Sequence, residues 1–143
     1  GLDAPQLPLP DLSPLTTMQG LKKLYLHNTT FAVMPSGSLA GTLEKLDISA
    51  TLTNELSWLT NLELLRDLEI AHIEAPDLSP LAAMSSLEAL NVAGCKVGDL
   101  VWLTNLNQLR TLNLNLTEIY NFQPIANLSS LRSLSLGGAY INS

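Results

Sequence analysis

Apolar residues recur along this chain in a fixed register of 22 residues. Each copy opens with Leu-x-x-Leu-x-(Leu/Ile/Val), which places apolar side chains at its positions 1, 4 and 6. The opening leucines are Leu21, Leu43, Leu65, Leu87, Leu109 and Leu131. A short fixed period indicates one structural unit that is copied and stacked, because a single copy cannot bury its apolar face alone.

Alternation at positions 4 and 6 of each copy predicts a short strand with one buried face. We expect the strands of successive copies to form one parallel sheet. They should begin within about two residues of the following positions: Lys23, Lys45, Asp67, Ala89, Thr111 and Ser133. In this phase Leu90 should be buried and Asn91 should face solvent, because neighbouring residues of a strand point to opposite faces.

The second half of each copy is apolar at positions 14, 17 and 20, and a spacing of three is the period of a 3₁₀ turn. In the segment Asp77-Leu-Ser-Pro-Leu81, Pro80 suits a first helical turn, and Asp77 or Ser79 is available to cap it. The first full copy departs from the pattern, because Gly37 occupies position 17. We therefore predict an irregular loop over residues 34–41.

The 22-residue length and the Asp-Leu-Ser-Pro-Leu turn resemble the short leucine-rich repeats of bacterial internalins and of a leucine-rich regulator of a eukaryotic protein phosphatase. The resemblance implies an α/β solenoid with a parallel β-sheet on its concave face and short 3₁₀ or helical segments on its convex face. It covers nearly the whole chain as a single domain, 1–143. This domain comprises a partial repeat (1–20), full repeats from residues 21, 43, 65, 87 and 109, and an incomplete repeat (131–143). We expect the chain to be a fragment of a longer protein.

Position 9 departs from the asparagine that is usual in this family, whose amide bonds the backbones of adjoining turns. The series reads Thr29, Thr51, Ile73, Cys95, Thr117 and Ala139. Threonine hydroxyls can do part of this work. Ile73 and Ala139 cannot, so buried backbone groups there need another partner. Cys95 is the single cysteine, which excludes an intrachain disulfide, and we expect it to be buried and structural.

Composition narrows the range of partners. A net charge of −6 disfavours binding to phosphate backbones, so we expect no nucleic acid partner. No apolar run approaches the roughly 20 residues that cross a bilayer, so we expect no membrane insertion by this segment. Glycosylation sequons begin at Asn28, Asn115 and Asn127, and a glycan at Asn115 would block the concave sheet.

The outward positions of the strands form the candidate binding surface. Asp47 and Glu69 should lie side by side on neighbouring strands, about 4.8 Å apart. Such a pair suits a cationic patch on a protein partner; alternatively, solvent and Lys45 screen it. The candidate partner-binding residues are Lys23, Tyr25, His27, Lys45, Asp47, Asp67, Glu69 and Asn91.

Catalysis and cofactor chemistry are not expected. His27, Ser49 and Asp47 have the residue types of a hydrolase triad, but a flat ladder of strands supplies neither an oxyanion hole nor a pocket. No close-set metal-ligand motif is present. Trp58 and Trp102, in two identical pentapeptides, either cover the ridge between turns with partial exposure or form a second contact surface on the convex side.

The sequence therefore predicts a non-catalytic protein–protein interaction module that binds a partner on its concave face. The alternative is a structural spacer or assembly segment of a larger surface or cytoskeletal protein, without a discrete ligand site.

Overall fold

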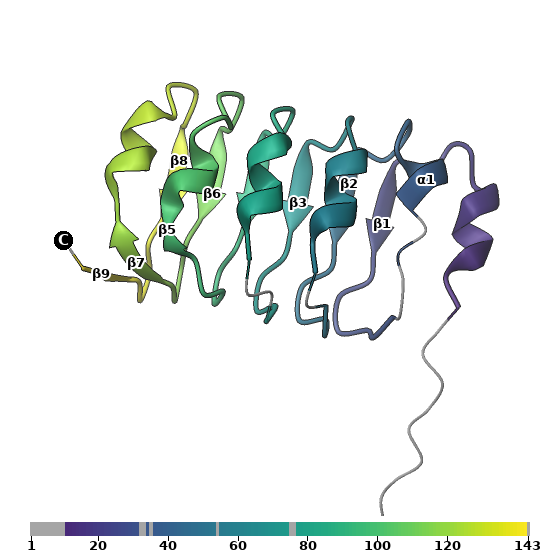
Figure 1. Cartoon of the computed structure of the whole chain (residues 1–143), viewed down its shortest axis with the longest axis horizontal. Coiled ribbons are helices and arrows are strands. Elements are labelled where there is room, and N and C mark those ends of the chain that lie inside the picture. Colours follow the sequence, from purple (N-terminus) through teal and green to yellow (C-terminus); the bar gives the residue numbers. More distant parts are fainter. Residues whose placement is uncertain (1–10, 32–33, 35, 54, 75–76, 143) are drawn as a thin grey trace, which may run out of the picture.

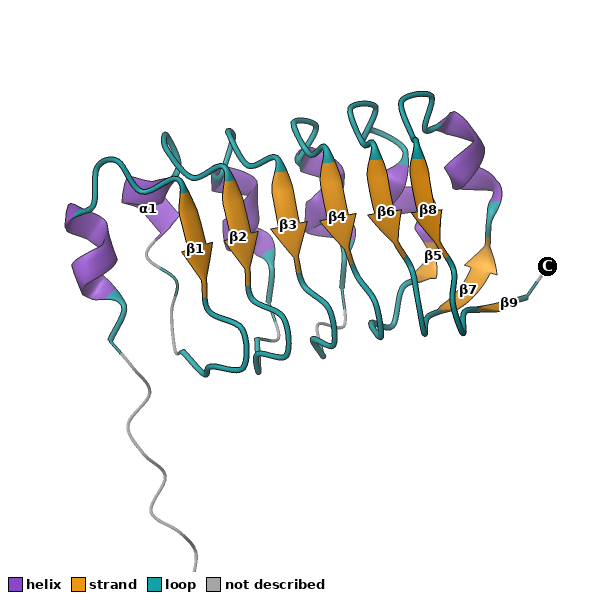
Figure 2. Ribbon diagram, turned by 180° about the vertical axis from the view of Figure 1, so that it is seen from behind, coloured by secondary structure: helices purple, strands orange, loops and turns teal. Residues whose placement is uncertain are grey.

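The computed structural model describes residues 11–31, 34, 36–53, 55–74 and 77–142. Its 22-residue coils stack side by side, with a six-stranded parallel sheet on one side and a row of short helices on the other (Figures 1 and 2). The sheet order is β1-β2-β3-β4-β6-β8. Its strands are β1 (Lys23–Tyr25), β2 (Lys45–Asp47), β3 (Asp67–Glu69), β4 (Ala89–Asn91), β6 (Thr111–Asn113) and β8 (Ser133–Ser135). We call the solvent-facing side of this sheet the concave face and the helical side the convex face.

All six strands begin at the predicted residues, which confirms the sequence register. Each residue pairs with the residue 22 positions later, as Leu46 does with Leu68 and Leu68 with Leu90. The middle residue of each of these three strands points inward and is at most 2% exposed. The period of the sequence is therefore the stacking period of the coils.

The convex side carries the expected 3₁₀ helices. They are η1 (Ser13–Thr17), η2 (Ser57–Asn61), η3 (Ser79–Ala83), η4 (Leu100–Leu103) and η5 (Gln123–Asn127). Asp77 Oδ1 accepts the Ser79 backbone N–H at 2.8 Å, so it satisfies a free donor of the first turn of η3. Asp11, Asp99 and Asn121 occupy the same place in their coils and accept in the same way.

The prediction of an irregular loop over residues 34–41 was wrong in part. A four-residue α-helix, α1 (Ser36–Leu39), forms in that segment. Leu39 is fully buried there, two positions after Gly37, and Met34 is also buried. The apolar side chain that position 17 lacks is thus supplied from a shifted position, and the helix completes the convex layer at this coil.

A second, smaller parallel sheet lies in the last coils and was not predicted. It consists of β5 (Gly98–Asp99), β7 (Glu118–Asn121) and β9 (Tyr140–Ile141), in that order. Ile119 at its centre is fully buried. These strands stand at positions 10–13 of their coils, outside the leucine phase that located the six main strands.

At position 9, threonine hydroxyls and a cysteine thiol make hydrogen bonds in place of an asparagine amide. Thr29, Thr51 and Thr117 donate their hydroxyls to the carbonyl three residues earlier in their own coil, at 2.5–2.7 Å. In the coil of Ile73, the equivalent carbonyl belongs to Ile70, and it accepts from the Cys95 thiol of the following coil at 3.1 Å. Cys95 therefore replaces the donor that Ile73 lacks.

Candidate functional site

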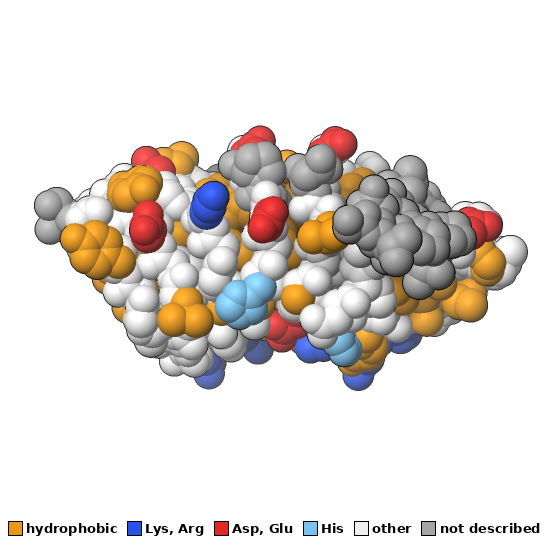
Figure 3. All heavy atoms as spheres, turned by 90° about the horizontal axis from the view of Figure 1, so that it is seen from below, with side chains coloured by type: hydrophobic (Ala, Val, Ile, Leu, Met, Phe, Trp, Pro, Cys, Tyr) orange, Lys and Arg blue, Asp and Glu red, His pale blue; other side chains and the backbone are white. Residues whose placement is uncertain are grey.

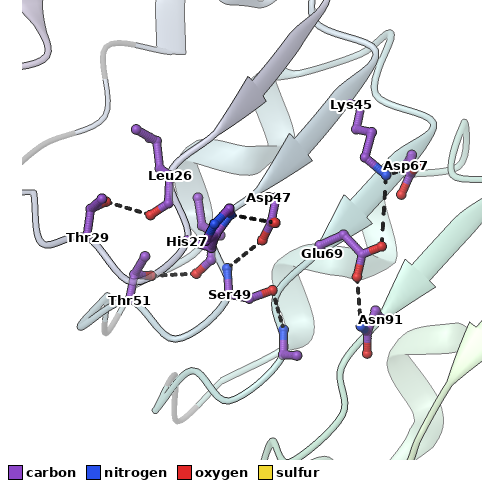
Figure 4. Close-up of polar contacts among 12 residues, drawn as sticks. Leu26, His27, Thr29, Lys45, Asp47, Ser49, Thr51, Asp67, Glu69 and Asn91 are labelled. Carbon is purple, nitrogen blue, oxygen red and sulfur yellow. Dashed lines mark hydrogen bonds and ion pairs between the residues drawn. The ribbon is translucent and has the colours of Figure 1, made fainter.

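The eight candidate residues lie on four neighbouring strands and the turns that follow them. Lys23 and Tyr25 come from β1, Lys45 and Asp47 from β2, Asp67 and Glu69 from β3, and Asn91 from β4, with His27 just after β1. Residues far apart in the chain thus meet on one face. Figure 4 shows how the polar groups of six of them point toward one another: His27, Lys45, Asp47, Asp67, Glu69 and Asn91. Asp47 pairs with Glu69 across β2 and β3, as the sequence predicted.

Lys45 stands between carboxylates of the next strand. Its Nζ lies 2.5 Å from Oδ2 of Asp67 and 3.9 Å from Oε1 of Glu69. The hydrogen bond to Asp67 raises the pKa of Lys45, so this amine stays charged at neutral pH. The side chains are a quarter to a third exposed. Lys45 therefore neutralises part of the acidic charge, as the screening alternative expected.

Asp47 is held by two donors within the chain. His27 Nδ1 lies 3.1 Å from its Oδ2, and the Ser49 backbone N–H donates to its Oδ1 at 2.9 Å. The Asp47 side chain is 18% exposed, whereas that of His27 is 55% exposed. The carboxylate is therefore fixed in orientation, and the imidazole is the more accessible half of the pair.

Asn91 lies on the outward face of β4, as predicted, but its side-chain amide is engaged in hydrogen bonds. Its Nδ2 donates to Oε2 of Glu69 at 2.7 Å, and its Oδ1 accepts the Ala93 N–H at 3.0 Å. The side chain is half-buried and links β3 to the turn after β4. It orients Glu69 from the side opposite Lys45.

The second half of the concave face is neutral. Asn113 Oδ1 accepts the Asn115 N–H at 3.0 Å, and Asn115 Oδ1 accepts the Gly137 N–H at 2.5 Å. Here the amide oxygens serve the backbone of the turns, and no charged side chain stands on β6 or β8. The charges of this face are therefore confined to β1–β3.

The geometry of a hydrolase triad is incomplete. The Ser49 hydroxyl accepts the Ala71 N–H at 3.2 Å, and the described hydrogen bonds include none between Ser49 Oγ and His27. Nor do the described residues contain a group of three or more His, Cys, Asp or Glu side chains that could hold a metal ion. In the same part of the chain no helix is long and apolar enough to span a bilayer.

Exposed apolar side chains gather elsewhere, on the edge formed by the loops that follow the strands. Leu116, Tyr120 and Tyr140 are each about three-fifths exposed, at 62%, 59% and 63%. Figure 3 views this edge and shows hydrophobic side chains toward the C-terminal end. The sequence analysis missed this surface, because its members stand at positions 8, 10 and 12, outside the repeat signature.

The two tryptophans have different environments despite their identical pentapeptides. Trp58 is half-buried and donates its indole N–H to the Glu55 carbonyl at 3.0 Å. Trp102 is only 7% exposed, so the expectation of partial exposure was wrong for it. It lines a groove of about 520 Å³ between η3 and η4, which the sequence did not predict.

Solved structures similar to this chain are repeat proteins. An internalin (inlF) of Listeria monocytogenes is 24% identical with a TM-score of 0.65; the match covers 93% of this chain and 46% of that one. A leucine-rich repeat protein of Leptospira interrogans is 21% identical with a TM-score of 0.78, over 90% of this chain and 34% of that one.

A third likeness is the ectodomain of the plant membrane receptor kinase GASSHO1/SCHENGEN3 from Arabidopsis thaliana, solved in complex with Casparian strip integrity factor 2. It is 23% identical with a TM-score of 0.71, over 89% of this chain and 16% of that one. No protein-family model and no curated protein sequence matches the chain. This chain thus spans less than half of each of these three structures. The 22-residue register, the parallel sheet and these likenesses together show that the chain has a leucine-rich repeat fold.

Proposed function

We propose that this chain is a non-catalytic module that binds a protein partner on the first half of its concave face. The observation that carries the proposal is an exposed aromatic residue beside an ordered polar network. Tyr25 is 52% exposed on β1 and pairs with Asp47 of β2, whose carboxylate is already fixed. Exposed tyrosines are common binding anchors, and a preordered surface loses little entropy when a partner docks.

The charges favour a partner with a cationic patch. Lys23 and Lys45 stand against the three carboxylates of Asp47, Asp67 and Glu69, so the surface keeps an acidic excess. Lys45 and Asn91 hold Glu69 in place rather than covering it, since its side chain remains 32% exposed. Fixed carboxylates of this kind steer a cationic partner and set its register more than they add raw affinity.

Likeness in fold agrees with a binding role. The receptor ectodomain GASSHO1/SCHENGEN3 was solved with Casparian strip integrity factor 2 bound, so a solenoid of this architecture can present a binding surface. The alternative is a structural spacer or assembly segment without a discrete site. The neutral second half of the concave face supports this alternative.

Tyr25→Ala provides the test, because the side chain is exposed and removing it leaves the buried core intact. The immobilised wild-type chain and the variant are incubated with extract of the source cell, and captured proteins are identified by mass spectrometry. Tyr120→Ala is the matched control, since Tyr120 is 59% exposed but lies on β7. We expect Tyr25→Ala to lower capture of a specific protein at least about tenfold, as for a binding anchor, and Tyr120→Ala to leave it unchanged.

Two outcomes contradict the proposal. Capture that survives Tyr25→Ala but fails with Tyr120→Ala would move the site to the apolar edge of the last coils. A wild-type chain that captures no more than either variant would favour the spacer alternative. Circular dichroism and thermal melts must first show that both variants fold like the wild type.

A further inference from the structure

The groove between η3 and η4 lies on the convex side, away from the proposed concave site. Its volume of about 520 Å³ falls within the usual range of ligand pockets. Leu78, Val97 and Trp102 line it and are each 5–7% exposed, so its inner wall is apolar and well packed. Val101, 58% exposed, lies at its edge.

Trp102, which lines the groove, carries an unpaired hydrogen-bond donor. The indole Nε1 of Trp102 is buried and has no hydrogen-bond partner among the described residues. A buried N–H without an acceptor costs roughly 1–3 kcal/mol, so native proteins seldom leave one unmet. Trp58 shows that the same pentapeptide can satisfy its indole, because Trp58 Nε1 donates to the Glu55 carbonyl.

The helices that carry the two tryptophans begin at different positions of their coils. The residue equivalent to Glu55 is Asp99, which belongs to β5 and pairs with Asn121 of β7. Its backbone is extended, with φ −85° and ψ 133°, and η4 starts directly after it at Leu100. The helix therefore begins one position earlier than η2, whose first residue is Ser57. The unpaired indole of Trp102 therefore goes with a helix in a different register, whereas Trp58 in the register of η2 bonds the Glu55 carbonyl.

The charges at the groove define what can enter. Asp77 and Asp99 are exposed carboxylates, and the hydrogen bond from the Ser79 backbone N–H holds the pKa of Asp77 below its usual value, so it is ionised at neutral pH. Lys96 is the one ammonium group of the lining. The acidic excess repels a ligand carboxylate and attracts a cation.

We propose that this groove is a second docking site, which takes an apolar side chain of a protein partner with a basic residue next to it. The apolar side chain lies against Leu78, Val97 and Trp102. The partner's backbone carbonyl accepts the Trp102 indole N–H, which requires this buried nitrogen to become accessible. The basic side chain lies near Asp77 and Asp99.

The test uses blocked dipeptides as probes and the Trp102 indole as reporter. In ¹⁵N-labelled Trp58→Phe protein, Trp102 is the only tryptophan, so it gives a single indole N–H resonance. Titration with acetyl-leucyl-lysine amide should shift this resonance downfield and saturably, with a Kd in roughly the millimolar range for so small a ligand. If Trp58→Phe does not fold, Trp102→Phe assigns the two resonances of the wild type by loss of one.

Matched probes separate the two parts of the proposal. Acetyl-leucyl-glutamate amide should bind at least about fivefold more weakly, because its carboxylate meets the acidic excess. Acetyl-glycyl-lysine amide should cause no saturable shift, because it lacks the apolar group. Asp99→Asn keeps a side-chain oxygen for the Val101 N–H and should narrow the difference between the lysine and glutamate probes.

A blocked groove gives the control. Ala82 lines the groove and is partly exposed, so Ala82→Leu should fill the space and abolish the shift without removing a core side chain. The proposal is overturned if no probe perturbs Trp102 at tens of millimolar. It is also overturned if the glycine probe acts like the leucine probe, or if Ala82→Leu responds like its parent.

Discussion

Each coil turns through a left-handed backbone conformation at its position 8, and the residues there differ in how they accept it. Non-glycine residues carry φ values of 53–57° at Asn28, Ala50, His72 and Leu116, and glycine carries 68° at Gly94 and Gly138. A residue with a Cβ pays roughly 1–2 kcal/mol in this region. The large side chains of His72 and Leu116 lie over the glycine of the next coil, which explains why glycine is needed there.

Gly94→Ala should therefore be strongly destabilising. A Cβ at this residue would stand 2.2 Å from Nδ1 of His72, and the φ of +68° adds strain. We expect a loss of about 2–4 kcal/mol in the free energy of unfolding, measured by denaturant melts. Gly98→Ala is the matched control, since its φ is +55° but its Cβ would meet nothing nearer than Tyr120 at 3.7 Å, so only about 1 kcal/mol should be lost.

A double mutant separates collision from backbone strain. If His72→Ala restores most of the difference between the two glycine variants, the collision is the cause. Equal losses for Gly94→Ala and Gly98→Ala would instead attribute the whole effect to the left-handed backbone and contradict the close contact with His72.

Between neighbouring coils, the thiol of Cys95 takes over a bond that threonine makes elsewhere. The Ile70 carbonyl accepts from Cys95 because Ile73 has no hydroxyl, and this donor crosses from one coil to the next. Burial raises the pKa of the Cys95 thiol, so the group stays protonated and can donate at neutral pH. A residue from the next copy thus completes the hydrogen bonding of a copy that lacks its own donor.

Cys95→Ala should cost about 1–3 kcal/mol, because it leaves the buried Ile70 carbonyl without this donor. Ile73→Thr should recover part of that loss in the Cys95→Ala background. In other coils a hydroxyl at position 9 bonds the equivalent carbonyl, as Thr51 does with that of Ile48. Denaturant melts of the single and double mutants measure both. An Ile73→Thr change that destabilises the two backgrounds equally would contradict the exchange of donors.

The raised pKa also makes the contribution of Cys95 depend on pH. The folded protein holds the thiol proton more tightly than the unfolded chain does. The wild type should therefore lose stability relative to Cys95→Ala as the pH rises above the ordinary thiol pKa of about 8.5, whereas the difference should be constant below it.

At the scale of the elements, the sequence predicted what the 22-residue period controls. The starts of all six main strands follow from the leucine phase, because a one-residue slip would expose Leu68 or Leu90. The same phase brings Asp47 beside Glu69. It does not determine rotamers, so the bonds of Lys45, His27 and Asn91, which decide how much charge remains free, had to come from the structure.

Other elements depend on contacts that the repeat does not encode. β5 pairs with β7 of the next coil, and η4 begins one position earlier in its coil than η2 although the two pentapeptides are identical. Local sequence therefore could not distinguish the buried Trp102 from the half-buried Trp58, nor predict the groove beside Trp102. The hydrogen bonding at position 9 could not be predicted from local sequence either, because the donor to the Ile70 carbonyl is Cys95, 25 residues away.

Across the whole molecule, each coil contacts chiefly its immediate neighbours, so stability is a sum of coil and interface contributions. The charged side chains that directly precede the strands also pair only with those of neighbouring coils among the described residues. Lys22 pairs with Glu44 at 2.7 Å, and Glu88 pairs with Arg66 at 2.6 Å and with Arg110 at 3.7 Å. These side chains are 31–66% exposed, and each such pair contributes at most about 1 kcal/mol. The buried leucines, not the charges, join the coils.

Amide hydrogen exchange should therefore vary along the stack. In the fifth full coil, the N–H groups of Leu114 and Leu116 donate to Ser135 and Gly137 of the next coil at 2.9 Å. The equivalent N–H groups of Leu136 and Gly138 have no such acceptor in the described part of the chain, and Leu134 beside them is 36% exposed. We expect the amides of Leu114 and Leu116 to exchange at least about a hundredfold more slowly, because opening them requires separating two packed coils. Exchange of this chain followed by NMR would measure the ratio. Equal protection at both places would show that Leu136 and Gly138 are bonded in solution, as they would be if the last coil associated with another surface.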